Sequence, residues 1–321
     1  MHAFVVEDGG ALVWKDVPTP EPGPGEVRIR VTAAGLNRAD LLQRKGFYPP
    51  PPGASPYLGL ECSGTIEALG PGVDGVALGD PVCALLAGGG YAEFVVCPIG
   101  QVLPVPDGVS LADAAGLPEV WATTWMVLEQ QARFTPGSSV LVHGAGGGVG
   151  LTLVQWIRIR QGRSFAIAGD EAKLARCREL GASGTANRHE GPWRPAVQAW
   201  APEGVDVVVD PVGASALADH QQILAVGGRV VVIGLLGGRE ATLDFGRLLV
   251  KRQSIIGTVL RARPVHEKAE IVQQLQREVW PRIASGDLDV GVTRVVPRDE
   301  ADAAHQAMAT NATTGKWVIR L

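Results

Sequence analysis

The residues most suited to chemistry in this chain form a glycine-rich turn near its middle. An apolar run at 139–143 leads directly into the segment GAGGGVG at 144–150, which opens a stretch of helix length. A turn without side chains lets backbone amides approach a pyrophosphate, and the N-terminus of the following helix adds the positive end of its dipole. The spacing departs from a strict G-x-G-x-x-G, because Ala145, Gly147 and Gly150 fit it only with alanine in first place. The succession of strand, turn and helix nevertheless predicts a dinucleotide site.

A group about 20 residues past such a turn helps to decide which nicotinamide cofactor binds. Asp170 stands at about that distance, and its carboxylate suits the ribose 2′-hydroxyl of NAD. Against this, Gly169 leaves room, and Lys173 and Arg188 can neutralise the 2′-phosphate of NADP. The alternative for each cation is an ordinary solvated charge. These residues by themselves leave NAD and NADP in balance.

The elements around this turn are of α/β type. After about Leu117, short apolar strands alternate with helix-length segments, which predicts a parallel, doubly wound sheet. The expected strands are 139–143, 164–168, 205–210 and 229–234, and the expected helices are 148–160, 171–180 and 215–224.

The two ends of the chain are predicted to form a second, β-rich domain. Strands are expected at 26–33, 62–69, 81–85 and 91–97, separated by Gly and Pro turns. A helical stretch at 265–284 leads to strands at 292–297 and 317–321, which most simply complete the N-terminal domain. Between the early strands, Tyr48 precedes four prolines. Because proline lacks a backbone donor and restrains its predecessor, this segment must be a loop, and such loops often border ligand clefts.

Composition excludes several classes of protein. The 321 residues suffice for about two domains, and 46% hydrophobic with 19% charged residues fits neither a disordered nor a fibrous chain. A net charge of −4 gives no basic surface for nucleic acid. We find neither a signal peptide nor an apolar run long enough for a membrane helix. The scattered Cys62, Cys83, Cys97 and Cys177 do not suggest a disulfide framework. We therefore expect a cytoplasmic protein with small-molecule ligands and with no nucleic-acid or membrane partner.

Several segments together point to a family. They are AAGLNRAD (33–40), GFYPPPPGAS (46–55), LGLECSG (58–64), the glycine turn, ELGA (179–182) and GK (315–316). With them the sequence resembles the zinc-free NADPH:quinone oxidoreductases, the zeta-crystallin-like branch of the medium-chain dehydrogenase/reductase superfamily. Within this branch it is most similar to the subfamily of the stress-inducible quinone oxidoreductase. The first two segments are more specific than the glycine turn.

The resemblance implies an architecture and an assembly. A GroES-like catalytic domain is expected from residues 1–118 and 265–321, and a Rossmann domain from residues 119–264. Members of the family bind NADPH between these domains and usually form dimers through the edge of the Rossmann sheet. We therefore expect a homodimer, with a tetramer as the alternative.

The resemblance also assigns site residues. Asn37 and Thr123 are expected near the nicotinamide. Gly169, Lys173 and Arg188 are expected around the 2′-phosphate, and Asn311 lies where some relatives have an arginine for that phosphate. The residues expected at the pyrophosphate are Gly146, Gly147, Gly148 and Val149. Asp170 replaces a serine common in the family, and its carboxylate would repel the phosphate, so NADH stays an alternative to NADPH.

The same resemblance predicts a site without metal. Zinc enzymes of the superfamily have a cysteine at the position of Asn37 and a histidine at that of Leu60. Neither replacement is a usual zinc ligand, Glu61 alone cannot hold the ion, and a four-cysteine structural loop is absent. Catalysis without a Lewis acid suits acceptors that are already electrophilic, such as quinones and activated enones, and suits unactivated alcohols poorly.

The expected reaction is hydride transfer from the reduced nicotinamide to such an acceptor. Tyr48 is the candidate donor of a hydrogen bond or proton to the developing oxyanion; alternatively it only lines the cleft, because water can protonate a hydroquinone. Asn37 would orient the cofactor or the substrate carbonyl, and Asp40 is interpreted as a capping or pairing residue. A packed role is expected for His143, and a solvated loop for Arg261 and Arg263.

Two other functions stay open from the sequence. A stand-alone medium-chain enoyl reductase would share every cofactor feature and prefer enones to quinones. A non-enzymatic NADPH-binding protein is the second alternative, although the intact glycine turn favours an enzyme.

Overall fold

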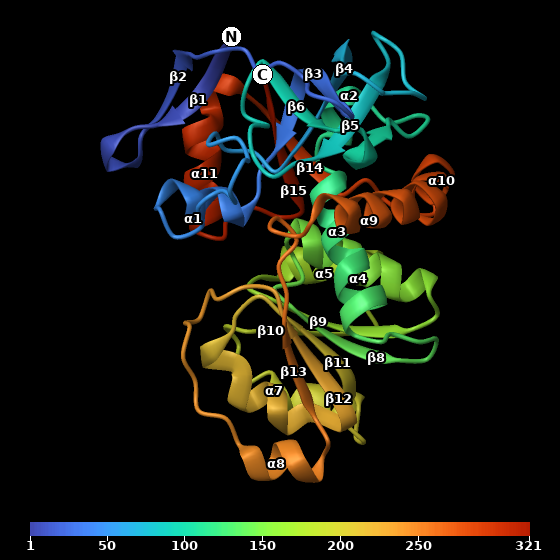
Figure 1. Cartoon of the computed structure of the whole chain (residues 1–321). Coiled ribbons are helices and arrows are strands. Elements are labelled where there is room, and N and C mark those ends of the chain that lie inside the picture. The colour runs from blue at the N-terminus through green and yellow to red at the C-terminus, as the bar shows by residue number, and fades with distance from the viewer. The chain divides into compact units, whose positions relative to one another are not determined.

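The computed structural model describes residues 1–321, apart from the side chain of Asp8. The chain divides into two compact units (Figure 1): unit 1 comprises Met1–Ala122 and Leu260–Leu321, and unit 2 comprises Thr123–Val259. The boundaries expected from the sequence, after residue 118 and before residue 265, differ from these by a few residues. Helix α3 (Pro118–Trp125) contains the first boundary.

Unit 2 is built on a parallel sheet of six strands in the order β10-β9-β8-β11-β12-β13. Counted within the unit, this is the order 3-2-1-4-5-6 of doubly wound dinucleotide-binding domains. The strands are β8 (Ser139–His143), β9 (Arg163–Ala168), β10 (Gly184–Asn187), β11 (Val205–Asp210), β12 (Leu224–Val232) and β13 (Ser254–Gly257). The helices are α4 (Gly148–Ile159), α5 (Glu171–Glu179), α6 (Arg194–Trp200), α7 (Leu217–Ile223) and α8 (Phe245–Val250), with a π-helical segment at Met126–Gln131. The expected parallel sheet is therefore confirmed.

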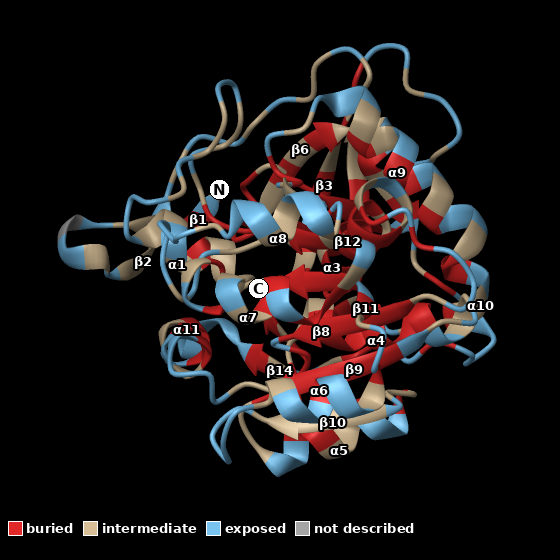
Figure 2. Cartoon of the chain, turned by 90° about the horizontal axis from the view of Figure 1, so that it is seen from below, coloured by how far each residue is buried: buried red, intermediate tan, exposed pale blue. Residues whose placement is uncertain are grey.

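The core of unit 2 explains why its strands are apolar. All five residues of β8 are buried, since this central strand is covered on both faces. On one face, Val197 of α6 and Ile223 of α7 belong to the same cluster as Leu141 and Val208 of the sheet. Figure 2 shows the buried strands beneath helices whose outer faces are exposed. The strand order reverses between β8 and β11, so their carboxyl ends border the crevice in which such sheets bind ligands.

Unit 1 contains a seven-stranded sheet and a separate hairpin. The sheet follows the order β14-β15-β3-β4-β5-β7, and β6 pairs with β3. Its strands are β3 (Glu26–Gly35), β4 (Glu61–Leu69), β5 (Pro81–Leu85), β6 (Phe94–Pro98), β7 (Val102–Pro104), β14 (Val292–Pro297) and β15 (Lys316–Arg320), and the hairpin is β1 (His2–Val6) with β2 (Leu12–Asp16). The helices are α1 (Arg38–Arg44), α2 (Leu111–Ala114), α9 (Val265–Glu278), α10 (Trp280–Ala284) and α11 (Ala301–Ala309).

The two ends of the chain meet in this sheet, as expected. Strand β15 pairs with β3 in antiparallel register, with Ile319 opposite Ala34, and β14 pairs with β15 in parallel. This pairing brings Lys316, at the start of β15, to the end of β3. A residue near the C-terminus thereby reaches the interior of the N-terminal strands.

Two expectations need correction. The helical stretch expected at 265–284 is two helices, which meet at Val279. Pro281 explains the break, because it has no N–H to continue the ladder of the preceding helix. The hairpin β1–β2 has no counterpart in the expected elements; its pairs, such as Val5 with Val13, lie on a half-buried ribbon whose sequence has no regular alternation. Among the described residues, none of the helices has the length and hydropathy needed to cross a bilayer.

Candidate active site

The glycine turn joins β8 to α4 at the position expected from the sequence. Gly144 has a φ of +69°, in the left-handed region that favours glycine. Gly147 is the N-cap residue of α4, and no side chain caps this helix. The first N–H groups of α4 therefore lack an intrahelical acceptor, and Gly148 and Val149 beside them are partly exposed. These free amides fit the pyrophosphate of a dinucleotide.

The other glycines of the turn serve packing. Gly146 is buried, and a Cβ atom built on it would lie 2.7 Å from the side chain of Lys173. A Cβ on Gly150 would lie 2.4 Å from the carbonyl oxygen of Ala145. Both positions require glycine because strand, turn and helix approach closely there.

The residues expected around the ribose gather at the end of β9. Asp170 is the N-cap of α5: its Oδ1 accepts from the Lys173 amide at 2.9 Å, and its Oδ2 lies 2.9 Å from Lys173 Nζ. A Cβ on Gly169 would lie 2.6 Å from the guanidinium nitrogens of Arg188, so the missing side chain makes room for that cation. Lys173 is 8% exposed and is not an ordinary solvated charge. Two cations and one carboxylate thus surround this position.

Three potential metal ligands lie close together: His143 at the end of β8, Asp210 at the end of β11, and His220 in α7. His143 Nδ1 is 3.2 Å from His220 Nε2, and His220 Nδ1 is 3.3 Å from Asp210 Oδ2. The ligand atoms of the three residues lie within 4.8 Å of one another. His220 Nε2 is in contact with His143, whereas His220 Nδ1 and Asp210 Oδ2 are buried without a hydrogen-bond partner among the described residues. The His143 ring also packs edge-on against Trp193, which agrees with the packed role expected for it.

In unit 1, Asn37 belongs to a buried group of charged side chains. Glu61 is fully buried, and its Oε1 pairs with Lys316 Nζ. Asn37 Nδ2 donates to Glu61 Oε1 at 3.0 Å, and Lys316 Nζ donates to Asn37 Oδ1 at 2.6 Å. The other oxygen, Glu61 Oε2, accepts from the Glu119 amide at 2.9 Å. The Asn37 amide therefore has partners within the protein at both ends.

Asp40 has the structural role expected for it. Its Oδ2 accepts from the Asn37 amide at 2.8 Å and from the Tyr91 hydroxyl at 3.0 Å. Its Oδ1 accepts from the Gly59 amide at 3.2 Å. Burial raises the pKa of Asp40 to about 6, although these hydrogen bonds oppose the shift.

Tyr48 lies in the proline-rich loop beneath Arg261. The guanidinium carbon of Arg261 is 5.3 Å from the centroid of the Tyr48 ring, and its Nη1 donates to the Tyr48 carbonyl oxygen at 3.1 Å. The solvated loop expected for Arg261 is wrong, because this residue is only 3% exposed. Burial raises the pKa of the Tyr48 hydroxyl, and the nearby Glu119 raises it further.

The remaining expected residues divide between the two units. Thr123 lies in α3 and is 9% exposed. Asn311 is exposed, has a φ of +62°, and accepts a hydrogen bond from Arg38. Unit 2 thus brings together the turn and the ribose position, whereas unit 1 holds Asn37, Tyr48 and Asn311.

Sequence reasoning missed the roles of Lys316, Glu119 and Arg261. Charged residues flanked by apolar ones are candidates for buried, paired groups. Two residues have this sequence context: Lys316 begins an apolar strand, and Glu119 lies between Leu117-Pro118 and Val120-Trp121. Their partners lie far away in sequence, and Lys316 reaches Glu61 only through the pairing of β15 with β3.

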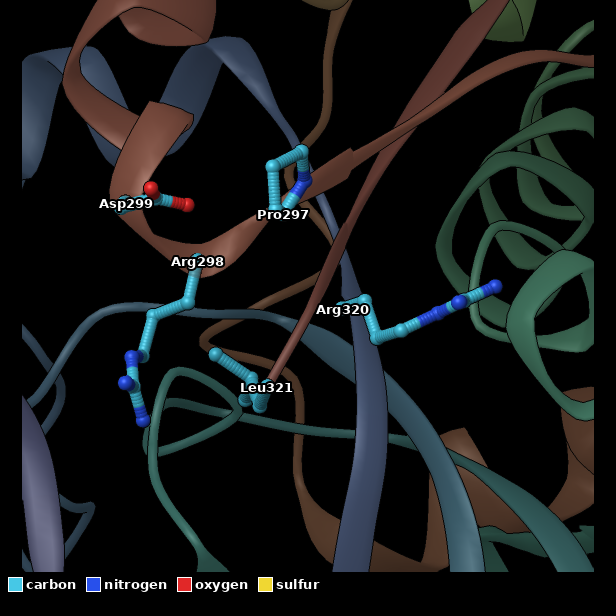
Figure 3. Close-up of a pocket in the computed structure, with 5 residues that line it drawn as sticks. All are labelled: Pro297, Arg298, Asp299, Arg320 and Leu321. Atoms are coloured by element: carbon cyan, nitrogen blue, oxygen red, sulfur yellow. The ribbon is translucent and has the colours of Figure 1, made fainter.

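An open pocket of about 440 Å³ lies near the C-terminus of unit 1 (Figure 3). It is lined by Pro297, Arg298, Asp299, Arg320 and Leu321. The Arg298 and Arg320 side chains point in different directions. None of the residues expected to act in chemistry lines this pocket, so we assign it no part in the site.

Comparison with known proteins matches both parts of this architecture. Residues 23–107 match the family model "Alcohol dehydrogenase GroES-like domain", and residues 148–277 match "Zinc-binding dehydrogenase". The chain is 32% identical to the quinone oxidoreductase of Rattus norvegicus and covers 96% of it, with 99% of this chain aligned. It is 30% identical to a 2-haloacrylate reductase of a Burkholderia species, with 99% of this chain and 98% of the relative aligned.

One solved structure and one longer protein are also similar to this chain. A mycobacterial protein solved in complex with NADPH superposes with a TM-score of 0.89 at 31% identity, over 100% of both chains. A mycocerosic acid synthase-like polyketide synthase of Mycobacterium tuberculosis is 31% identical over 93% of this chain, which spans only 14% of that protein.

A GroES-like β domain joined to a doubly wound nucleotide-binding domain defines a medium-chain dehydrogenase/reductase. Within this superfamily, the chain belongs to the quinone oxidoreductase branch.

Proposed function

We propose that this chain is an NADPH-dependent oxidoreductase that transfers a hydride to quinones or activated enones without a metal ion. The observation that carries the proposal is that the side chains of Asn37, Glu61 and Lys316 bond to one another. Asn37 and Leu60 stand where zinc relatives have ligands, and the remaining carboxylate, Glu61, is neutralised by the Lys316 ammonium. This set of residues does not fit zinc, since it offers no free anionic or imidazole ligand.

The cofactor part of the proposal rests on the residues of unit 2. The free amides of Gly148 and Val149 would bind the pyrophosphate, and Lys173 with Arg188 would face the 2′-phosphate of NADPH. When bound, the nicotinamide supplies the hydride. Tyr48 would donate a hydrogen bond to the oxyanion that develops on the acceptor. Hydrogen bonds with Glu61 and Lys316 would hold the Asn37 side chain in a fixed position beside this site. Asn37 itself would not transfer a proton.

The relatives support electrophilic acceptors. One is a quinone oxidoreductase, and another is a reductase named for 2-haloacrylate, an activated alkene. The similarity to a solved enoyl reductase, 27% identical with a TM-score of 0.85, favours a second candidate, the reduction of enoyl thioesters.

An acceptor screen tests the proposal. The purified chain is supplied with NADPH and, separately, 1,4-benzoquinone, methyl vinyl ketone, 2-chloroacrylate or crotonyl-coenzyme A, while loss of NADPH absorbance is followed. We expect turnover with the quinone and the vinyl ketone, and a loss of about 100-fold in kcat for Tyr48→Phe if its hydroxyl protonates the acceptor. Preference for the thioester would favour the enoyl reductase, and no turnover with any acceptor would contradict both.

We also propose a homodimer formed through the edge of the unit 2 sheet. Strand β13 is the last strand in the sheet order, and an edge strand offers unpaired backbone groups to a second copy. Helix α8, which precedes β13, exposes Phe245, Leu249 and Val250. Apolar side chains gathered beside an open strand are typical of an interface between protein chains.

A further inference from the structure

Unit 2 contains a buried carboxylate without a permanent counter-ion. Asp210 is the last residue of β11, and its side chain is 0% exposed. Among the described residues, its only ion-pair contact is with His220, whose imidazole is charged only when it is protonated. Buried charges in proteins are as a rule paired or coordinate a metal ion. The carboxylate of Asp210 therefore calls for a cation.

One oxygen of this carboxylate faces an imidazole nitrogen that also has no hydrogen bond. His220 is fully buried in α7, and its Nδ1 lies 3.3 Å from Asp210 Oδ2. Both atoms are shielded from solvent, and neither has a hydrogen-bond partner among the described residues. In a hydrogen bond the N–H points along the line to its acceptor. Two ligands of one metal ion instead direct their lone pairs at a common third position, and this contact has that character.

His143 supplies a third nitrogen at the same place. It is the last residue of β8, it is 7% exposed, and its Nδ1 is 3.2 Å from His220 Nε2. The ligand atoms of the three residues lie within 4.8 Å of one another. Tetrahedral ligands at about 2.0–2.1 Å from a zinc ion are about 3.3 Å apart, as Asp210 Oδ2 and His220 Nδ1 already are. The His143 ring has to turn toward these two atoms when the ion binds.

The surroundings hold the three side chains in place. The second oxygen of the carboxylate, Asp210 Oδ1, accepts from the Val212 amide at 2.7 Å and from the Gly213 amide at 3.0 Å. The ring of Trp193 packs against both imidazoles, with its centroid 5.7 Å from each. Metal ligands are typically oriented by such hydrogen bonds, and an apolar shell limits the access of water to the ion.

We propose that His143, Asp210 and His220 bind a divalent transition-metal ion, with Zn²⁺ as the expected occupant and water as the fourth ligand. Two imidazoles and a carboxylate are ligands that zinc accepts, whereas Mg²⁺ prefers oxygen ligands alone. The ion supplies the charge that Asp210 lacks, and it ties the end of β8 to β11 and α7.

This site is separate from the zinc site of related enzymes. Its three residues belong to unit 2, whereas Asn37 and Leu60, which stand where zinc relatives have ligands, belong to unit 1. The hydride transfer proposed above does not pass through this ion, and the inference does not rest on that transfer.

Zinc binding to the metal-free chain tests the site. The full chain is freed of metal with a chelator and titrated with ZnCl₂ in a calorimeter. We expect one Zn²⁺ per chain. In His220→Gln the affinity should be at least about 100-fold weaker, because losing a ligand costs more than the roughly 10–100-fold typical of a group that only orients one. His189→Gln, at an exposed histidine of unit 2, should bind Zn²⁺ as the unmodified chain does. Equal affinities in all three proteins would overturn the inference.

The melting temperature distinguishes a metal ion from a proton shared by Asp210 and His220. Zn²⁺ that binds the folded chain should raise the Tm of the unmodified chain, and Mg²⁺ at the same concentration should not. If Asp210 is instead paired with a protonated imidazole, Zn²⁺ will leave the Tm unchanged, and the inference fails. Because neither NADPH nor an acceptor is present, this outcome is independent of the proposed function.

A measurement on the unmodified chain is decisive even where a variant does not fold. Crystals soaked with Zn²⁺ should show an anomalous scattering peak about 2.0–2.2 Å from the ligand atoms of His143, Asp210 and His220. Peaks at exposed histidines only, or no peak at all, would overturn the inference whatever the variants do.

Discussion

The ammonium group of Lys316 and the carboxylate of Glu61 form an ion pair inside the β domain, although 255 positions separate them in sequence, the difference between 316 and 61. Glu61 is fully buried and Lys316 is 3% exposed. Lys316 Nζ also donates to the Leu36 carbonyl at 2.8 Å, so its donors have several partners. Removing each charged group from water costs free energy, and the attraction between the two groups offsets this cost.

Replacing Lys316 by methionine should destabilise the fold strongly. The change leaves Glu61 buried without its counter-ion, which typically costs about 3–5 kcal/mol. Denaturant unfolding should show this loss, and the double variant Glu61→Gln/Lys316→Met should recover part of it. Arg277→Gln is the control, because the pair of Arg277 with Glu278 is exposed and contributes at most about 1 kcal/mol. Equal losses for Lys316→Met and Arg277→Gln would contradict the stabilising role of the buried pair.

How much of this structure the sequence predicts depends on how far apart in the chain the interacting residues lie. The glycine turn, β8 and α4 could be predicted, because strand periodicity, turn residues and helix start all lie within about 20 residues. The sequence also predicts that β15 joins the N-terminal sheet, because completing that domain is the simplest arrangement for the strands near the C-terminus. The buried state of Arg261 could not be predicted, since its acceptors, Tyr48 and Ala87, are brought to it only by tertiary folding.

The carboxylate of Asp170 should weaken NADPH binding. It lies at the end of β9 beside Lys173 and Arg188, and it opposes the charge of a 2′-phosphate. Asp170→Ser keeps an N-cap residue for α5 and removes the negative charge. We expect the Kd for NADPH to fall about tenfold, or about 1.4 kcal/mol, and that for NADH to rise, because the carboxylate suits the 2′-hydroxyl of NAD. Fluorescence titration with both cofactors checks this.

The control for this prediction is Glu171→Gln, which removes an adjacent exposed charge that pairs with Arg178. It should leave the ratio of the two affinities as it is. If Asp170→Ser changed NADH and NADPH binding equally, the carboxylate would not act on the 2′ position.

A charge on the exposed face of α8 should dissociate the proposed dimer. Leu249 is 74% exposed in the single chain, and in the dimer Leu249→Asp would bury an unpaired carboxylate. Light scattering after size-exclusion chromatography should show half the mass of the unmodified protein. Leu78→Asp, at a similarly exposed leucine of unit 1, should keep the mass. A monomeric unmodified chain, or a dimeric Leu249→Asp variant, would exclude this interface.

The buried imidazole of His305 should make the fold sensitive to acid. Its Nε2 lies 3.2 Å from the Tyr91 hydroxyl, and burial, followed by repulsion from Arg44, lowers the pKa of His305 to about 4. The unfolded chain, with an ordinary histidine pKa of about 6.5, therefore binds the proton that the folded chain excludes, and stability is lost as pH falls from about 6.5 to 4.

His305→Gln should lack this dependence, so the unfolding free energy of the unmodified chain should fall relative to that of the variant between pH 7 and pH 4. Lowering the pKa of His305 from about 6.5 to about 4 corresponds to about 3 kcal/mol between pH 7 and pH 4. Asp40 acts in the opposite sense, because its pKa is raised to about 6 and its protonation favours the fold as pH falls below that value. The comparison therefore uses the difference in unfolding free energy, in which Asp40 contributes to both proteins. His266→Gln, at an exposed histidine of α9, should follow the unmodified chain at every pH. If His305→Gln did the same, the buried imidazole would have no part in acid sensitivity.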